Sequence, residues 1–351
     1  MTRPMRLLAQ SLAGAVFLLS AAAYGGITAE DILNAVGAKD RQQLLAGDII
    51  TVTRPEQETN DAGLAVTLGL IVPADLNKAL STLRSLSASG DPAQHITTRE
   101  IVGPVSGDGT SKAFAAVGFA ADEADEVNKL LHAKAGKTFN FSQEELGWVR
   151  EAAAAGGEPA QAAAKVMRRV LASRYLAYRQ SGLDGLAPYA RGGKDLSRPG
   201  AELAATTDQM PVVRKRLPEF YNAYRHYPKT GAKGVQNRFF WEKKTIDGRP
   251  MFSVRHELVE VRPDYAAIGI RDFYIDNNLD AFQVAIALVP YGSQTLVVLV
   301  NQTYTEQVSG AKRVVGVHIG RSMVESNTKP LFEKLQKALG RAKPAASAKA
   351  P

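Results

Sequence analysis

The fold is decided by five runs in the last third of the chain: VQNRFFWEKKTI (235–246), PMFSVRHELVEV (250–261), YAAIGIRDFYI (265–275), AFQVAIALV (281–289) and TLVVLVNQTYT (295–305). Each run is rich in β-branched and aromatic residues, which favour extended strands. Residues typical of turns separate the runs: Asp247-Gly248, Pro263-Asp264, Asn277-Asn278 and Tyr291-Gly292. Short strands joined by short turns pair with their neighbours in the chain. The segment therefore predicts an antiparallel meander of five strands.

Helical patterns fill much of the chain before the meander. Two capping boxes, at residues 28–31 and 142–145, mark the starts of helices. The longest helical pattern covers residues 159–180 and is closed by Gly182. Further helices are expected at 74–86, at 121–135, around Pro218 and, after the meander, at 323–339.

Four more strands are expected before the longest helix, at 48–53, 62–73, 97–105 (TTREIVGPV) and 112–120 (KAFAAVGFA). The segment from Gly182 to Gly200 is rich in glycine and proline and is expected to be a long irregular loop, a kind of segment that is often functional or disordered. The sequence shows no internal repeat.

These elements predict the α+β class, with a curved antiparallel sheet packed against several helices. We expect one mature domain over 24–341, with mixed strands and helices at 24–157, mainly helices at 158–230, and the meander with its closing helix at 231–341. Residues 342–351, AKPAASAKAP, are expected to be a disordered tail.

The N-terminal residues resemble a secretory signal peptide. Arg3 and Arg6 precede an apolar core over residues 7–19, and small residues follow up to Ala23. The apolar core is shorter than the roughly 20 residues that span a bilayer, although a retained membrane anchor is the alternative. We expect cleavage near Ala23, a periplasmic or secreted location, and no transmembrane segment in the mature chain.

Composition narrows the classes of partner. The chain carries 43 basic and 35 acidic residues, a net charge of +8, and loss of Arg3 and Arg6 with the leader lowers this charge to +6. The basic residues are scattered, as in Arg214-Lys215-Arg216, so a nucleic-acid partner is not expected. There is no cysteine, so the fold depends on its core and no thiol nucleophile exists.

His256 and Glu257 resemble the first half of a zinc-protease motif, but the position four residues after the histidine is Glu260. No other catalytic, phosphate-binding or calcium-binding pattern is complete, so neither a metal nor another cofactor is expected. In a strand, His256 shares one face with Phe252 and Leu258. Two interpretations stay open: a buried, hydrogen-bonded core histidine, and a polar anchor in a pocket between sheet and helices.

Aromatic and basic residues gather in the middle of the chain. They predict a cleft suited to an amphipathic or anionic ligand, although tyrosines that merely pack their rings would give the same pattern. The candidate ligand-binding residues are His256, Trp241, Tyr274, Arg174, Tyr178 and Arg271. Asp272, Gln283 and Asn301 are further polar candidates from the meander.

Two resemblances add to these expectations. ASRYLAYRQSGLDGLAPYAR (172–191), LPEFYNAYRHYP (217–228), VRHELVEV (254–261) and IRDFYI (270–275), with the strand at Trp241, resemble a group of exported bacterial proteins without an established activity. The order of elements, with LIVPADLNKAL (70–80) before a late meander and a closing helix, is similar to the helix-grip fold of START-like lipid-binding proteins. That similarity implies an apolar cavity, with residues 97–230 as a large helical insertion.

Three hypotheses about function follow. The first is an exported, non-catalytic protein that binds an apolar or amphipathic small molecule such as a lipid. The alternative is an envelope assembly or cell-wall interaction protein that acts through its surface, by the Gly182–Gly200 segment and the basic tail. The third is a hydrolase or isomerase that uses His256 with Asp272 or Glu257.

Overall fold

A computed structural model describes residues 27–53, 63–88, 96–230, 234–246, 248–277, 279–304 and 328–342. Within these residues, eight strands form one antiparallel sheet in the order β1-β2-β10-β9-β8-β7-β6-β3. The strands are β1 (Ile50–Thr53), β2 (Gly63–Val72), β3 (Thr97–Glu100), β6 (Val235–Ile246), β7 (Arg249–Val261), β8 (Ala266–Ile275), β9 (Ala281–Tyr291) and β10 (Gln294–Tyr304). The predicted five-strand meander is confirmed as β6 to β10, and so is the α+β class.

The meander extends at both edges with strands from the first hundred residues. β2 pairs along its whole length with β10, and β1 continues the sheet beyond β2. β3 pairs with β6 at the opposite edge. The first long strand therefore lies beside the last strand of the meander, and strands that are far from the meander in sequence form both edges of the sheet.

One face of the sheet packs against α3 (Leu76–Ala88) and a helix at residues 328–339. Aliphatic side chains from alternate positions of β2, β8, β9 and β10 form this layer, with Leu80 and Leu83 of α3 and Phe332 of the last helix above them. Because side chains alternate between faces along a strand, every second residue of β8, β9 and β10 faces this layer. Burial of this apolar surface holds both helices on the sheet.

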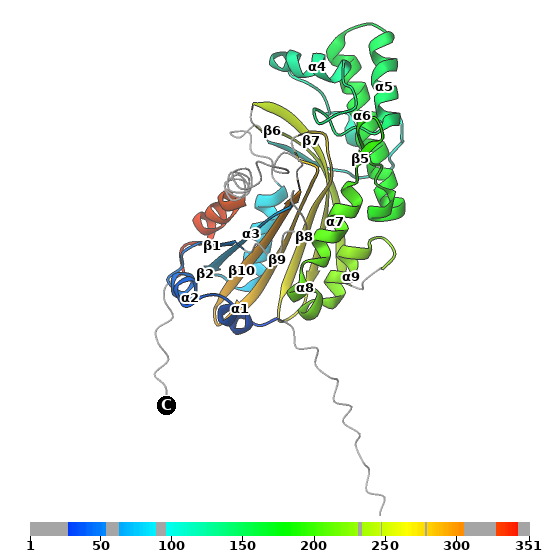
Figure 1. Ribbon diagram of the computed structural model, residues 1–351. Coiled ribbons are helices and arrows are strands. Elements are labelled where there is room, and N and C mark those ends of the chain that lie inside the picture. The colour runs from blue at the N-terminus through cyan, green and yellow to red at the C-terminus, as the bar shows by residue number, and fades with distance from the viewer. Residues whose placement is uncertain are drawn as a thin grey trace, which may run out of the picture.

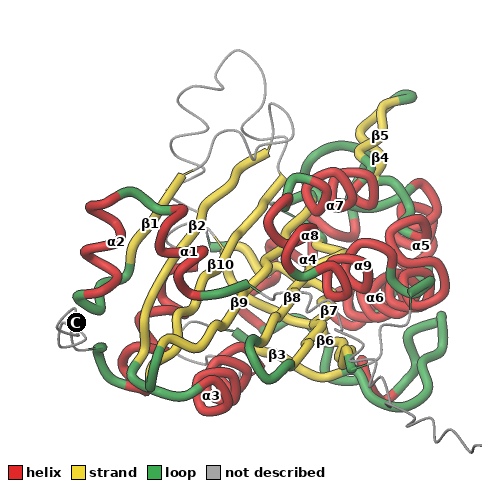
Figure 2. The backbone as a smooth tube through the Cα atoms, turned by 90° about the horizontal axis from the view of Figure 1, so that it is seen from below, coloured by secondary structure: helices red, strands yellow, loops and turns green. Residues whose placement is uncertain are grey.

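The opposite face carries a second helical layer (Figures 1 and 2). Its helices are α1 (Ala29–Ala35), α6 (Pro159–Ser181), α7 (Pro199–Asp208), α8 (Pro211–Arg216) and α9 (Pro218–His226). In α9, the ring of Tyr224 lies so close to β8 that a Cβ at Gly269 would come within 2.8 Å of two ring carbons. Glycine at position 269 therefore permits the close packing of α9 on the sheet.

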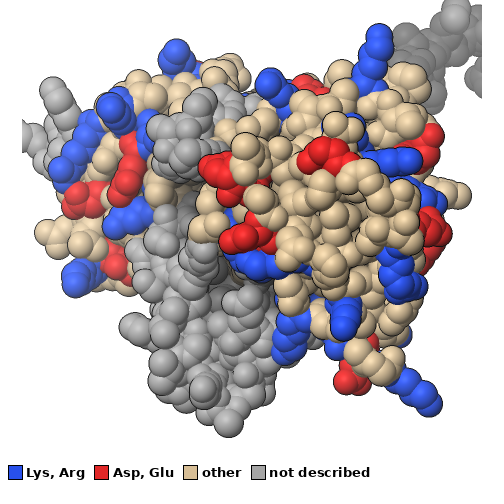
Figure 3. Space-filling model, turned by 90° about the horizontal axis from the view of Figure 1, so that it is seen from above, with Lys and Arg blue, Asp and Glu red and all other residues tan. Residues whose placement is uncertain are grey.

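Further helices extend one end of the molecule beyond β6 and β7, where α4 (Ala124–Leu131), α5 (Gln143–Ala154) and α6 lie together (Figure 1). The other elements are α2 (Ala38–Leu45), the 3-10 turns η3 (Lys112–Phe114), η4 (Ala121–Glu123) and η5 (Gly182–Gly185), and the hairpin strands β4 (Tyr189–Gly192) and β5 (Asp195–Ser197). Both capping boxes are confirmed, at the starts of α1 and α5. Figure 3 views this end of the molecule and shows basic and acidic side chains interspersed outside the grey atoms.

Three expectations about local structure are wrong, two of them only in part. KAFAAVGFA (112–120) is not a strand; η3 and turns replace it, because Phe114 and Val117 insert into the core of the helical end instead of pairing along a sheet. Of the expected strand 97–105, only Thr97–Glu100 pairs. The segment Gly182–Gly200 is not irregular throughout, since it contains η5 and the β4–β5 hairpin.

Several expectations concern residues that the structure does not describe. The signal peptide at 1–23, residues 323–327 of the closing helix and residues 343–351 of the tail lie outside the described ranges. Within those ranges, no helix combines the length and the apolar character that a membrane crossing requires.

Candidate functional site

A row of polar side chains crosses the sheet on the face that carries α6, α7 and α9. The cross-strand register places His256 of β7 opposite Arg271 of β8, Arg271 opposite Gln283 of β9, and Gln283 opposite Gln302 of β10. All four side chains are buried. The strand pairing thus places these four residues in one row across the sheet, although they are unevenly spaced in the sequence.

His256 is held between two neutral partners. Its Nδ1 lies 2.9 Å from the Tyr178 hydroxyl and its Nε2 lies 2.8 Å from Oδ1 of Asn237, while its ring stacks on Phe239 at a centroid distance of 4.4 Å. A neutral imidazole satisfies both contacts when Nε2 donates to Asn237 and Nδ1 accepts from Tyr178. Burial, and then the positive charge of Arg271, lowers the pKa of His256 well below its usual value.

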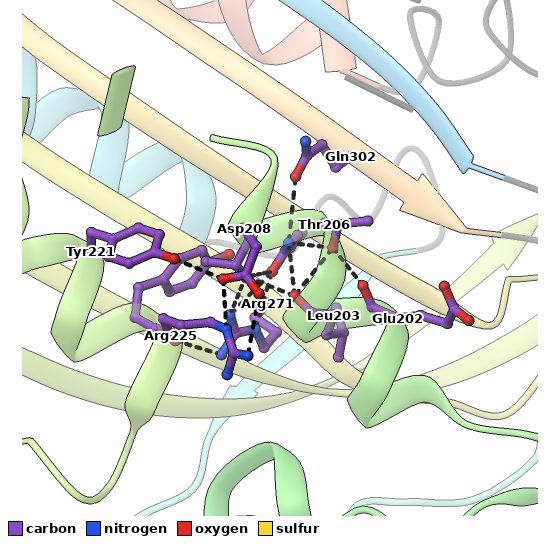
Figure 4. A network of polar contacts seen from close by, with 11 residues as sticks. Glu202, Leu203, Thr206, Asp208, Tyr221, Arg225, Arg271 and Gln302 are labelled. Carbon is purple, nitrogen blue, oxygen red and sulfur yellow. Dashed lines mark hydrogen bonds and ion pairs between the residues drawn. The ribbon is translucent and has the colours of Figure 1, made fainter. Parts of the chain in front are cut away.

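Arg271 is a buried cation surrounded by neutral groups. It donates to the hydroxyl of Thr207 (3.0 Å), to Oε1 of Gln283 (3.1 Å) and to the carbonyl of Tyr224 (2.8 Å), and its guanidinium lies 4.1 Å from the centre of the Tyr224 ring. No carboxylate in the described part of the chain is bonded to it. Gln283 in turn donates to Thr206 at 2.6 Å. Figure 4 shows Arg271 and Gln302 reaching from the sheet toward the helix that carries Leu203 and Thr206.

Arg174 and Tyr274 form a separate buried group. Arg174 makes a bidentate ion pair with Glu145, with nitrogen to oxygen distances of 2.6 and 2.7 Å, and also donates to the Ala187 carbonyl. Its guanidinium lies 4.9 Å from the centre of the Tyr274 ring. Burial raises the pKa of Tyr274 well above its usual value, and its hydroxyl has no hydrogen-bond partner among the described residues. The contacts of Arg174 with Glu145 and with the Tyr274 ring join α6 to α5 and to the sheet.

The predicted site residues are therefore only partly brought together. His256, Tyr178 and Arg271 share one network, and Gln283 joins it. Trp241 lies elsewhere and donates its indole N–H to the carbonyl of Ala113 at 2.8 Å. All six predicted residues are buried among protein atoms.

Two acidic candidates lie on the other face of the sheet. Asp272 forms a bidentate pair with Arg255, which also binds Glu242 at 2.6 Å. Glu257 is buried, which raises its pKa. Its Oε1 lies 3.6 Å from nitrogens of Arg84 and of Arg238 and makes no hydrogen bond within the described part of the chain. His256 therefore does not meet either carboxylate that a catalytic pair with it would require. Sequence spacing missed this charged cluster because only the strand register shows that Arg255 and Asp272 are opposite each other.

An open groove lies at the helical end of the molecule, away from these buried networks. Its volume is about 1080 Å³, and its walls are the 108–119 segment, α5 and the first half of α6. The lining includes Phe119, Trp148, Glu151, Gln161, Lys165 and Arg168. The hollow was not predicted, although the run AAAAGGEPAQAAA (152–164) could have signalled it, because alanine and glycine leave space between helices.

The walls of the groove are joined closely at its base. A Cβ at Gly109 would come within 2.4 Å of the backbone of Arg168, so the 106–111 turn packs directly on α6. Arg168 donates from Nε to the carbonyl of Val117 at 2.9 Å. The guanidinium of Arg169 lies 4.1 Å from the centre of the Trp148 ring. These contacts hold the loop and the two helices in one arrangement around the hollow.

In the part of the chain that the structure describes, no three His, Asp or Glu side chains come together as ligands for a metal ion. No protein-family model matches the chain, and no curated protein or solved structure matches it either.

Proposed function

We propose that the protein is an exported, non-catalytic binding protein for an amphipathic small molecule such as a lipid, and that the ligand occupies the groove between residues 108–119, α5 and α6. The observation that carries this proposal is the groove itself, whose volume of about 1080 Å³ is close to that of small-molecule sites in proteins. The apolar rings of Phe119 and Trp148 lie in its lining together with charged side chains.

The groove is a different site from the one that the sequence predicts between the meander and the helices. There, the Tyr178 ring stacks on Phe273 at a centroid distance of 3.9 Å, and His256 and Arg271 are fully hydrogen-bonded to protein groups. Protein side chains occupy that space, so a ligand would have to displace them. The groove at the helical end requires no such displacement.

The order of the strands supports the similarity to the helix-grip fold, which remains part of the proposal. The first long strand, β2, pairs with the last strand, β10, and the helix at 328–339 crosses the same face as α3. The segment between β3 and β6 is then a helical insertion, and it carries the groove. The ligand site would thus belong to the insertion.

Native mass spectrometry of the mature protein, after incubation with a lipid extract of its own host, tests the proposal. We expect a bound mass that organic extraction removes. Gln161→Trp places a large ring at the groove, and it should abolish the bound mass. Gln180→Trp changes the same exposed residue type on the same helix outside the groove, and it should leave the bound mass intact. Equal retention by both variants would contradict this location of the site.

One observation favours the alternative function, an envelope assembly or cell-wall interaction protein. The β4–β5 hairpin projects from the molecule in Figure 2, and Leu196 near its tip is 43% exposed. An exposed leucine on a projecting hairpin could contact a partner. Leu196→Asp should then produce the envelope phenotype of a deletion strain while the purified variant keeps its unfolding midpoint. A normal envelope with this variant would remove the support for this alternative.

A further inference from the structure

We infer that the groove selects an amphipathic ligand whose polar part is an anion. The inference rests on the proposed function and names the chemical class of its ligand. It depends on which polar groups of the groove are already bonded within the protein and which are still available.

The carboxylates of the groove already have donors. Asp108 accepts from the Ser106 hydroxyl and from the backbone N–H of Thr110, and these hydrogen bonds lower its pKa to about 2. Glu158 caps α6 by accepting from the backbone N–H groups of Ala160 and Gln161. These two acidic groups are bound to their own turns, so they are poorly placed to hold a cationic ligand.

Glu151, the third acidic group, is paired with a cation. Its Oε2 lies 3.6 Å from Nη1 of Arg169, and the Arg169 guanidinium also covers the Trp148 ring. This pair is partly exposed, so its contribution to stability is small. Within the groove, the positive charge of Arg169 and the negative charge of Glu151 therefore offset each other.

Two basic groups in the lining are not offset in this way. Arg168 uses Nε for the carbonyl of Val117, and in the described residues its two Nη groups have no hydrogen-bond acceptor and no carboxylate partner. Lys165 is exposed, lines the groove and has no bonded partner among the described residues. The two residues are three positions apart on α6, so they lie on the same side of the helix. Together they present one ammonium and one guanidinium edge to a single ligand group, and a carboxylate or phosphate fits both donors.

The apolar part of the ligand has a surface of its own. The half-buried Phe119 and the small side chains of Ala152 and Ala160 line the groove, and Trp148, which is 9% exposed beneath the Arg169 guanidinium, adds only its uncovered edge. The hydrocarbon part of a ligand that lies against these residues would bury apolar area, while the anionic group of the same ligand reaches Lys165. The combination favours an amphipathic anion over an inorganic ion or a neutral lipid.

Three probes with the same twelve-carbon chain separate the two proposals: dodecanoate, dodecyl maltoside and dodecyltrimethylammonium, each below its micelle concentration. Binding is measured by isothermal titration calorimetry on the full mature chain, with the fluorescence of its two tryptophans as a second signal. We expect dodecanoate to bind at least about tenfold more tightly than the neutral and cationic probes, because charge-assisted hydrogen bonds are the strong ones.

Lys165→Gln and Arg168→Gln should each weaken dodecanoate binding by about tenfold and leave binding of the maltoside unchanged. Lys78→Gln removes the same charge from an exposed position on α3, outside the groove lining, and should have no effect. Lys165 makes no contact that the fold needs, so its variant tests the inference even if Arg168→Gln is poorly folded. Equal affinity for all three probes, or no effect of Lys165→Gln, would overturn the anionic ligand and leave the binding function standing. If none of the probes binds, both proposals are wrong.

Discussion

The buried ion pair of Arg174 and Glu145 should be a main contributor to the docking of α5 on α6. Both side chains are about 3% exposed, and Glu145 also caps α5, since its Oε2 accepts from the backbone N–H of Ser142 at 2.6 Å. Burial alone would lower the pKa of Arg174, but the charge of Glu145 outweighs it and raises that pKa. Arg174→Met leaves the carboxylate buried without its cation, which should cost about 3–5 kcal/mol in free energy of unfolding.

Glu145→Gln keeps an oxygen acceptor for the cap and an amide beside the guanidinium, so it should cost about 1–3 kcal/mol. In the double variant no unpaired buried carboxylate remains, and the loss should be smaller than the sum of the single losses by about 2 kcal/mol or more. Urea unfolding followed by far-ultraviolet circular dichroism, with Trp148 fluorescence in a Trp241→Phe background as a local probe, measures all four free energies. Additive losses, or a loss below about 1 kcal/mol for Arg174→Met, would refute the reasoning.

Three further predictions concern stability. Burial raises the pKa of Asp276 well above its usual value, so the folded state loses stability as pH rises through that pKa; Asp276→Asn should unfold at higher urea than the parent at pH 8 but not at pH 3.5. His256 has the opposite linkage, since its pKa is lowered in the folded state and the unfolded chain therefore takes up the proton first as pH falls. The free energy of unfolding should fall by up to about 1.4 kcal/mol per pH unit below about pH 6.5. In His256→Gln the urea midpoint should depend less steeply on pH in this range. Gly269→Ala should cost about 1–3 kcal/mol because its Cβ meets the Tyr224 ring, whereas Gly147→Ala, inside α5 with no close neighbour, should stabilise by up to about 1 kcal/mol in the same unfolding assay.

The elements that the sequence predicts well are those in which local pattern and tertiary packing agree. The alternation and turns of residues 235–305 specify the meander, and the capping box at Ser142 gives the first turn of α5. KAFAAVGFA alternates well enough for a strand, yet Phe114 and Val117 are three apart and both enter the helical core. Their partners are distant in sequence, so no local rule could reveal them.

The candidate sites show the same limit. His256 and Arg271 could be named individually as buried polar residues of strands, but their place in one row depends on the register between β7 and β8, which a shift of one residue would reverse. The groove forms because the side chains between α5 and α6 are small. The sequence shows that these residues are small, but only the packing of α5 against α6 shows that they lie between two helices.

The pairing of β2 with β10 has a consequence for how the chain reaches its final structure. Thr295 pairs with Val72, so the two halves of this ladder are separated by more than two hundred residues of chain. Contacts of such long range form slowly because a large loop must close first. Until β10 has left the ribosome, β2 can pair only with β1, and its other edge offers unpaired backbone groups to any strand nearby. Chains truncated before residue 294 should therefore aggregate, and a holdase chaperone that covers β2 would protect the nascent protein.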